Sequence, residues 1–217
     1  GFPKTLKKAG WVGNPVRADI AAVAPPAERF AGRGGPLKVL VVGGSLGAKV
    51  LNDTLPAIFA SAAQHGAIAV KHQTGKALQQ ITEQAYAQLQ QHNLTAEVSA
   101  FIDDMAHAYA WADVVICRAG ALTVSEVATA GIAALFVPLP TAIDDHQTAN
   151  ANVLVSKQAA LLMPQANLNP EHLVPLLQSW LSDKTPLAHM AHQARSCAID
   201  DAAEQVAAVC RRLTGVN

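Results

Sequence analysis

The stretch LKVLVVGGSLGA at residues 37–48 predicts a buried strand that turns directly into a helix through closely spaced glycines. Its first half is a β-branched, apolar run of strand length, and a longer helical pattern begins at Lys49. Glycines in such a turn allow unusual φ angles and a close approach of the backbone to a ligand. Because the next helix offers free N–H groups to an anion, the turn is a candidate phosphate site, with tight strand–helix packing as the alternative.

The same alternation of short strand patterns and longer helical patterns continues along the chain. It predicts the α/β class, as a Rossmann-like, doubly wound parallel sheet of about six strands. The expected strands are residues 37–42, 67–72, 95–100, 113–117, 133–138 and 160–163. The expected helices are residues 49–63, 76–92, 104–111, 123–130, 145–157, 170–181 and 186–213.

The first 36 residues are expected to be connectors, because glycine and proline recur at 13–15, 25–26 and 32–36. We place a boundary near residue 13, so that 1–13 is the remnant of an amino-terminal domain or a linker and 14–217 is the main domain. The chain starts at Gly1 without an initiator Met or a signal segment, which indicates a piece excised from a longer protein.

The composition argues against several classes of protein. The chain has 217 residues, of which 51% are hydrophobic, so it can bury a sizeable core. Its 16 Lys and Arg residues balance 16 Asp and Glu residues, and this lack of basic excess argues against nucleic acid as a partner. No apolar run reaches the length of a membrane span. The three cysteines lack CxxC spacing, which disfavours a zinc site or a disulfide framework and favours a reducing cytoplasm.

Ligands bind at the carboxyl ends of the strands in an open parallel sheet, so residues 118–126 are a second candidate loop. This loop is a strand–glycine turn–helix segment with Glu126 in the expected first helical turn. The carboxylate can accept two hydrogen bonds from a ribose diol, while the Thr123 hydroxyl and the helix N-terminus face a phosphate. The alternative is a capping box, in which Thr123 and Glu126 satisfy the N–H groups of their own helix.

Three further loops follow strands at the same edge. Asp103 and Asp104 open a helix and can act as caps. Residues 142–150 carry dense hydrogen-bonding side chains that suit sugar hydroxyls, or that only cap a solvated helix. Lys76 lies either near a phosphate or at an exposed helix start. The strand that ends at His72 lacks the acidic residue that binds the ribose of NAD, which disfavours that cofactor.

Six motifs, in this order, resemble the carboxyl-terminal half of the MurG family of glycosyltransferases. They are GNPVR at 13–17, GGSLGA at 43–48, HQTGK at 72–76, FIDDM at 101–105, CRAGALTVSE at 117–126 and DHQTANA at 145–151. The resemblance covers essentially the whole chain. It implies a GT-B enzyme of two Rossmann-like domains that transfers N-acetylglucosamine (GlcNAc) from UDP-GlcNAc to lipid I, forming lipid II in peptidoglycan synthesis. This chain would be the donor-binding half.

The resemblance also implies roles for particular residues. The Ile102 backbone would read the uracil edge, Glu126 would hold the ribose hydroxyls, and Gln147 would bind hydroxyls of the GlcNAc ring. Arg17 and Ser45 would face the diphosphate. The other implied donor contacts are Ala121, Leu122, Thr123, Val124, Ser125, Gly44, Gly47, Met105 and His146.

The implied mechanism needs neither a metal ion nor a cofactor, because helix N-termini and Arg17 can stabilise the departing diphosphate. The base that deprotonates the acceptor is expected in the absent amino-terminal domain, so this fragment alone would bind donor without turnover. Lipid I and the membrane would be contacted through that same domain. We therefore expect a cytoplasmic fragment and a full-length protein that is peripheral on the cytoplasmic face of the inner membrane. The helix at 186–214 would pack towards the absent domain.

Two other functions fit these loops. One is another UDP-sugar enzyme of the same architecture, such as a UDP-GlcNAc 2-epimerase, which needs acid/base carboxylates and a histidine around the sugar C2. The segment Gln147-Thr148-Ala149-Asn150 disfavours this alternative. The other is a non-catalytic UDP-binding module, which would stay inactive even after an amino-terminal half was restored.

Overall fold

The structure is a computed structural model, and it describes residues 12–44, 48–89, 92–140 and 145–214. Within them, six strands form one parallel sheet in the order β3-β2-β1-β4-β5-β6. The strands are β1 (Leu37–Val42), β2 (Ile68–Gln73), β3 (Leu94–Ser99), β4 (Val114–Cys117), β5 (Ala133–Phe136) and β6 (Leu161–Leu162). This order confirms the predicted doubly wound α/β fold, and the direction of winding reverses between β1 and β4.

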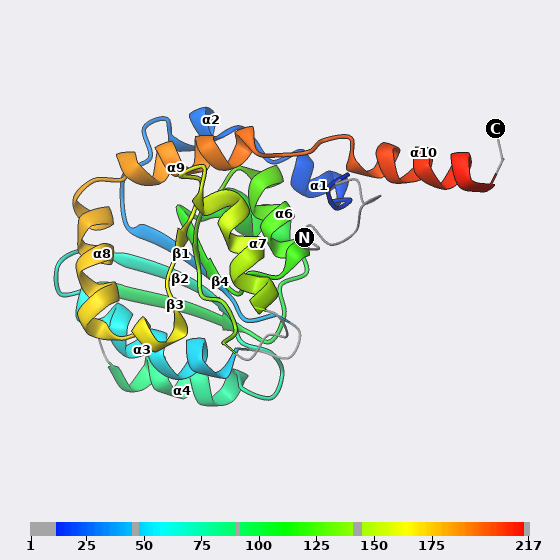
Figure 1. Cartoon of the computed structure of the whole chain (residues 1–217). Coiled ribbons are helices and arrows are strands. Elements are labelled where there is room, and N and C mark those ends of the chain that lie inside the picture. The colour runs from blue at the N-terminus through cyan, green and yellow to red at the C-terminus, as the bar shows by residue number, and fades with distance from the viewer. Residues whose placement is uncertain (1–11, 45–47, 90–91, 141–144, 215–217) are drawn as a thin grey trace.

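Helices cover both faces of this sheet (Figure 1). They are α1 (Ala18–Ala21), α2 (Pro26–Phe30), α3 (Lys49–Ala62), α4 (Gln79–Leu89), α5 (Met105–Trp111), α6 (Ala121–Ala130), α7 (His146–Val155), α8 (Pro170–Ser182), α9 (Thr185–Ser196) and α10 (Ala202–Thr214). One 3-10 turn, η2 (Gln165–Asn167), precedes α8.

Two sequence predictions about helices were wrong. The first 36 residues are not only connectors, because they contain α1 and α2; Pro26 occupies the first turn of α2, where a proline needs no hydrogen-bond donor. The single helix expected at 186–213 is two helices, α9 and α10. Between them Ile199 lies close to Gly13, so the break lets the chain pack against the start of the described domain.

The two faces of the sheet bury separate clusters of side chains, because successive residues of a strand point in opposite directions. In β1, Val39 and Val41 join a cluster with residues of α3 and α8. Leu40, between them, joins a second cluster with residues of α5, α6 and α7. Helix α9 contributes to both clusters. The fold thus follows from apolar central strands, β1, β4 and β5, that are covered on both sides.

The amino-terminal edge of the sheet is held by a buried carboxylate, Asp113, which has no exposed surface. Its Oδ2 accepts a hydrogen bond from the Lys38 backbone N–H at 2.9 Å and forms an ion pair with Lys184 Nζ, also at 2.9 Å. Arg33 Nε lies 2.6 Å from Asp113 Oδ1, as an ion pair rather than a directed hydrogen bond. Asp113 therefore connects the starts of β1 and β4 to the segments before β1 and α9.

One arginine side chain, Arg29, caps the carbonyl ends of two helices at the same edge. Arg29 donates to Tyr109 O in α5 at 3.3 Å and to Ala130 O at the end of α6 at 3.1 Å. Burial and the nearby positive charges of Arg33 and Arg195 lower the pKa of Arg29 to about 10. The guanidinium stays charged at neutral pH and complements the negative helix ends.

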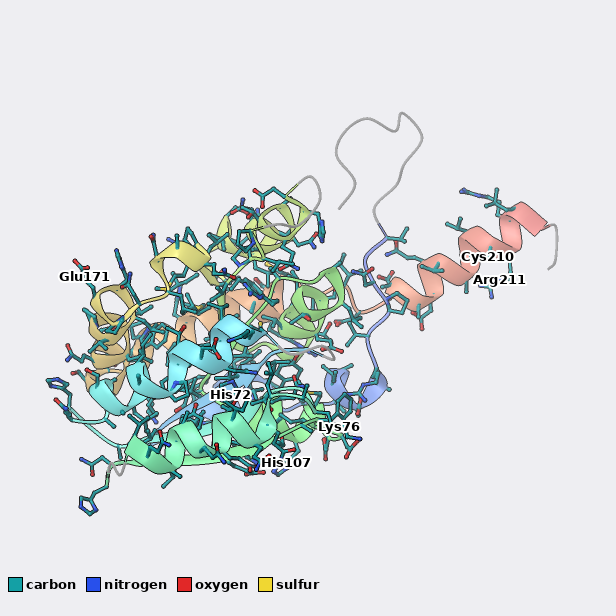
Figure 2. All side chains as sticks on the ribbon, turned by 90° about the horizontal axis from the view of Figure 1, so that it is seen from below. His72, Lys76, His107, Glu171, Cys210 and Arg211 are labelled. Atoms are coloured by element: carbon teal, nitrogen blue, oxygen red, sulfur yellow. The ribbon has the colours of Figure 1, made fainter. Side chains whose placement is uncertain are left out.

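Helix α10 extends away from the body of the molecule, and Figure 2 shows Cys210 and Arg211 on it, far from the sheet. Its last described side chain, Leu213, is 77% exposed. None of the helices in the described part of the chain is both long and apolar enough to cross a membrane.

Candidate functional site

The candidate site lies at the carboxyl edge of the sheet, around the switch between β1 and β4. The helices that follow these two strands, α3 and α6, pack on opposite faces of the sheet, and a reversal of this kind is where open α/β sheets bind their ligands. Gly44 follows β1 with φ +80°, and Gly120 follows β4 as the residue before α6. The two glycine turns singled out in the sequence therefore belong to the neighbouring central strands.

Helix α6 begins at Ala121, two residues earlier than the sequence analysis predicted, and this changes its first turn. Gly120 is the N-cap, and no side chain caps the helix there. Thr123 is the third helical residue, so the capping-box interpretation of Thr123 and Glu126 is wrong. Glu126 lies in the second turn rather than in the first. The first backbone N–H groups of α6 and the Glu126 carboxylate are consequently both available for a ligand.

Glu126 is half-buried, contacts a phenol and is influenced by the positive charge of a guanidinium. The Tyr109 hydroxyl donates to Glu126 Oε2 at 3.1 Å. Burial raises the pKa of Glu126, while the hydrogen bond from Tyr109 and the positive charge of Arg17 lower it, and the charge of Asp19 raises it. The structure thus brings Arg17 and Glu126, which are far apart in the sequence, into one electrostatic neighbourhood.

The segment that carries Arg17 is attached to the start of α6 by Asn14. Asn14 Nδ2 donates to Ser125 Oγ at 3.0 Å and to Ala121 O at 3.3 Å. Ser125 Oγ in turn donates to Ala121 O at 3.1 Å. Arg17 occupies the N-cap position of α1 and remains half-exposed, with Nε 3.6 Å from Asp19 Oδ1. Its guanidinium is therefore accessible to an anion.

The other implied contacts within α6 differ in exposure. Leu122 is 55% exposed, Ala121 is exposed and Thr123 is half-buried. Val124 is 7% exposed and packs in the cluster of the α5–α7 face, and its backbone N–H donates to Gly120 O at 2.9 Å. The side chains of Ala121, Leu122 and Thr123 can therefore contact a ligand, whereas the side chain of Val124 is part of the core.

A buried glutamine fixes the glycine turn after β1. Gln73, at the end of β2, accepts a hydrogen bond from Gly44 N at 2.9 Å and donates to Gly44 O at 3.0 Å. Its amide also donates to Ala100 O at 2.9 Å, after β3. Ser45 and Gly47 lie outside the described residues.

Ile102 and Met105 are half-buried beside the cluster of the α5–α7 face. Asp104 caps α5, because its side chain accepts a hydrogen bond from His107 N at 2.8 Å, which confirms its predicted capping role. Phe101, just before Ile102, is 64% exposed at this edge. An apolar surface and a backbone turn therefore lie where the resemblance places the uracil ring of the donor.

Gln147 and His146 are the first residues of α7, which follows β5. Gln147 Oε1 accepts a hydrogen bond from Leu139 N at 3.0 Å, so the side-chain amide is held at the carboxyl edge. Asp145 precedes the helix with φ +50°. Residues 142–144 of the predicted sugar loop lie outside the described residues.

The HQTGK motif contributes mainly buried contacts and ends in an exposed lysine. His72 has no exposed surface, and its ring nitrogens lie 3.0 Å from Asn52 Oδ1 and 3.0 Å from Tyr86 Oη. Lys76 is exposed, in agreement with the second of its two predicted settings, and Figure 2 shows it at the periphery while His72 lies inside.

Sequence reasoning missed the roles of Tyr109 and Gln73. Tyr109 sits in an otherwise apolar helical pattern, where an aromatic residue is normally core, and nothing local pairs it with Glu126. Gln73 carried a usable signal, because a polar residue at the end of a buried strand needs hydrogen-bond partners. Among the described residues, no three His, Cys, Asp or Glu side chains gather as a metal site would require.

Comparison with known proteins gives the family. The model of the glycosyltransferase family 28 C-terminal domain matches residues 38–206. The chain is 55% identical over 213 residues to the UDP-N-acetylglucosamine--N-acetylmuramyl-(pentapeptide) pyrophosphoryl-undecaprenol N-acetylglucosamine transferase of Aromatoleum aromaticum, with 98% of this chain and 58% of that protein covered. It is 52% identical over 214 residues to the Bordetella pertussis protein of the same name, with the same coverage.

Among solved structures, MurG from Acinetobacter baumannii superposes with a TM-score of 0.82 at 42% sequence identity, covering 89% of this chain and 55% of that one. The UDP-GlcNAc 2-epimerase from Neisseria meningitidis gives a TM-score of 0.52 at 9% identity and shares the fold alone. The chain spans about 58% of the length of the curated relatives it matches. With the family model matched over residues 38–206, this chain belongs to the glycosyltransferase family 28 C-terminal domain family.

Proposed function

We propose that this chain is the UDP-GlcNAc-binding half of a glycosyltransferase that moves GlcNAc to lipid I and so forms lipid II in peptidoglycan synthesis. The observation that carries the proposal is the second turn of α6, where Glu126 lies beside an uncapped helix N-terminus and within the field of Arg17. The names of the curated relatives, at 52% and 55% identity, support the substrate and the reaction.

The nucleotide is recognised by four features at the carboxyl edge. The Ile102 backbone faces the uracil, and the Glu126 carboxylate accepts hydrogen bonds from the ribose hydroxyls. The first N–H groups of α6 and the Arg17 guanidinium face the diphosphate, because both concentrate positive charge. The fourth feature is the backbone at Gly44, after the neighbouring strand β1. Gln73 holds it by two hydrogen bonds and donates a third to Ala100 O.

The sugar is bound at the start of α7. Gln147 is oriented by the Leu139 N–H, so its amide NH2 group can donate to hydroxyls of the GlcNAc ring. His146 is the next polar group at this position. Dense amide and imidazole groups suit a hexose, which presents hydroxyls as both donors and acceptors.

The chemistry follows from where charge develops during transfer. As the anomeric carbon becomes oxocarbenium-like, the departing UDP gains negative charge, which helix N-termini and Arg17 stabilise without a metal ion. The acceptor hydroxyl needs a base, and we assign it to the preceding domain of the full-length protein. That domain also contacts lipid I and the cytoplasmic face of the membrane. This chain alone therefore binds donor without turnover.

Calorimetric titration of the 217-residue chain with UDP-GlcNAc, UDP-GalNAc, UDP and ADP tests the proposal. We expect uridine nucleotides to bind in preference to ADP, and UDP-GlcNAc in preference to its C4 epimer. Glu126→Ala should weaken binding about 10-fold or more, as expected when a hydrogen-bonded charged group is removed. The matched control is Glu83→Ala, an exposed glutamate of α4 on the opposite face, which should bind as the wild type does.

Absence of binding by a folded wild-type chain, or equal losses in Glu126→Ala and Glu83→Ala, would contradict the donor site. An enzyme assay on the full-length protein separates the remaining alternatives. Transfer of GlcNAc to lipid I supports the proposed reaction, whereas epimerisation of UDP-GlcNAc or binding without any reaction would contradict it.

A further inference from the structure

Tyr109 is a buried phenol in contact with the carboxylate that the proposed function assigns to the ribose. Its side chain has no exposed surface, and its hydroxyl donates to Glu126 Oε2 at 3.1 Å. Tyr109 belongs to α5, which precedes β4, and Glu126 belongs to α6, which follows β4. The hydrogen bond therefore joins the two helices that flank the central strand at the site.

A glutamate side chain that carries a free carboxylate can rotate about its terminal bond, and it loses this freedom when it binds a diol. With Oε2 held by Tyr109, Oε1 and the remaining lone pair of Oε2 are left for the ligand. We propose that Tyr109 is a positioning residue for donor binding, whose hydroxyl fixes the Glu126 carboxylate in the orientation that accepts the ribose hydroxyls. This inference rests on the proposed function, because it requires Glu126 to contact the ribose.

The titratable and charged groups that surround Glu126 come from every neighbouring segment. Arg17 and Asp19 lie on the amino-terminal segment, Tyr109 on α5, and Cys117 at the end of β4. Burial and the charge of Glu126 raise the pKa values of both Tyr109 and Cys117. Tyr109 consequently remains a hydrogen-bond donor, and Cys117 remains an uncharged thiol, at neutral and acidic pH.

The arrangement makes donor affinity depend on pH in a specific way. Ribose hydroxyls donate to the charged carboxylate, so affinity falls as pH drops below the pKa of Glu126. The hydrogen bond from Tyr109 lowers that pKa, because it stabilises the charged form. Removing the phenol hydroxyl should therefore raise the pKa of Glu126 and move the loss of affinity to higher pH. UDP-GlcNAc is the appropriate probe, since its diphosphate diester has no ionisation near neutral pH.

The experiment is a series of calorimetric titrations with UDP-GlcNAc between about pH 4, near the ordinary pKa of a glutamate, and about pH 8. For Tyr109→Phe we expect affinity about 3- to 10-fold lower at neutral pH, with the acid decline shifted to higher pH. Tyr86→Phe is the matched control, because its hydroxyl also lies in a buried contact, 3.0 Å from His72 Nδ1, but on α4. It should leave both affinity and pH profile unchanged. Glu126→Gln should abolish the acid decline.

A second measurement remains usable if Tyr109→Phe does not fold. The chain contains two tyrosines, so 3-fluorotyrosine labelling gives two fluorine resonances, which Tyr86→Phe assigns. We expect UDP-GlcNAc to shift the Tyr109 resonance and to leave the Tyr86 resonance in place.

The outcomes distinguish this inference from the proposed function. If the wild type binds and Glu126→Gln weakens binding, but Tyr109→Phe keeps its affinity and pH profile, the positioning role is wrong and the donor site stands. An equal change in Tyr86→Phe, or an unmoved Tyr109 resonance in the donor complex, also overturns the positioning role. Failure of the wild type to bind UDP-GlcNAc overturns the proposed function, and the positioning role with it.

Discussion

At the scale of single residues, the buried imidazole of His72 makes stability depend on pH. Burial lowers the pKa of His72 from 6.5 to about 3, so the ring is neutral when it contacts Asn52 and Tyr86. In the unfolded chain the same ring takes up a proton near pH 6.5. The folded-state pKa is the lower one, so this contribution to stability is complete above pH 6.5 and is lost as pH falls towards 3.

We therefore expect the free energy of unfolding to fall by up to about 1.4 kcal/mol per pH unit below 6.5 through His72. Urea unfolding of the wild type and of His72→Gln at several pH values measures this pH dependence of the free energy of unfolding. Because other titrating groups are common to both proteins, the stability difference between them should shrink on acidification. A difference that stays constant with pH would show that the imidazole does not titrate in this way.

The site residues that could be predicted are those that follow strands in recognisable motifs. Glu126 and Gln147 both lie at the carboxyl edge, where the sequence pattern placed them. Tyr109 could not be predicted as a site residue, because its contact with Glu126 depends on how α5 packs beside α6. The apolar pattern of a helix does not indicate which residue of another helix a given side chain contacts. Asn14 belongs to the GNPVR motif, but its hydrogen bond to Ser125 could not be predicted, because the two residues meet only in the folded chain.

At the scale of elements, the end of α6 is shaped by Gly131, the C-cap, with φ +61°. A Cβ there would lie 2.9 Å from Arg195 Cβ in α9 and 3.0 Å from Pro26 Cγ in α2. The glycine thus allows both the left-handed cap and the close approach of three helices.

Gly131→Ala should lower the free energy of unfolding by about 1–3 kcal/mol, since strain in φ and the steric conflict act together. Chemical denaturation measures this loss. Gly34→Ala is the control, because a Cβ there meets nothing within 4 Å and Gly34 does not need a positive φ. Equal stability of the two variants would contradict the packing described at Gly131.

Strands were predicted better than helix boundaries because their signal is local. The β1 prediction matches residue for residue, since a run that is apolar except for Lys38, bounded by a proline and two glycines, leaves little ambiguity. The division of the expected 186–213 helix into α9 and α10 depends instead on Ile199 packing against Gly13, nearly the whole length of the chain away. Helix propensity continues through such a break, and only tertiary contacts end the helix.

At the scale of the whole molecule, Asp113 connects segments from the beginning, middle and end of the described chain. It contacts Lys38 N, Arg33 and Lys184, all at the amino edge of the sheet. A carboxylate with no exposed surface is tolerated only because these partners compensate for its desolvation.

Asp113→Asn should destabilise the protein by about 3–5 kcal/mol, because Arg33 and Lys184 would lose their buried counter-charge. Asp53→Asn provides the comparison, since Asp53 forms an exposed ion pair with Lys49 on one helix and should cost less than about 1 kcal/mol. Thermal and urea unfolding of both variants measure the difference. A small loss for Asp113→Asn would mean that the amide replaces the carboxylate without penalty.

The position of Asp113 has a practical consequence for the use of this protein as a reagent. Asp113 lies at the start of β4, and the glycine turn of the site lies at the end of the same strand. The four residues of β4 separate Asp113 from this turn by about 13 Å. Substitutions that strengthen the amino edge can therefore raise the melting temperature while the shape of the ligand edge is preserved. A chain with a higher melting temperature would withstand immobilisation and repeated screening of small compounds that compete for the proposed nucleotide site.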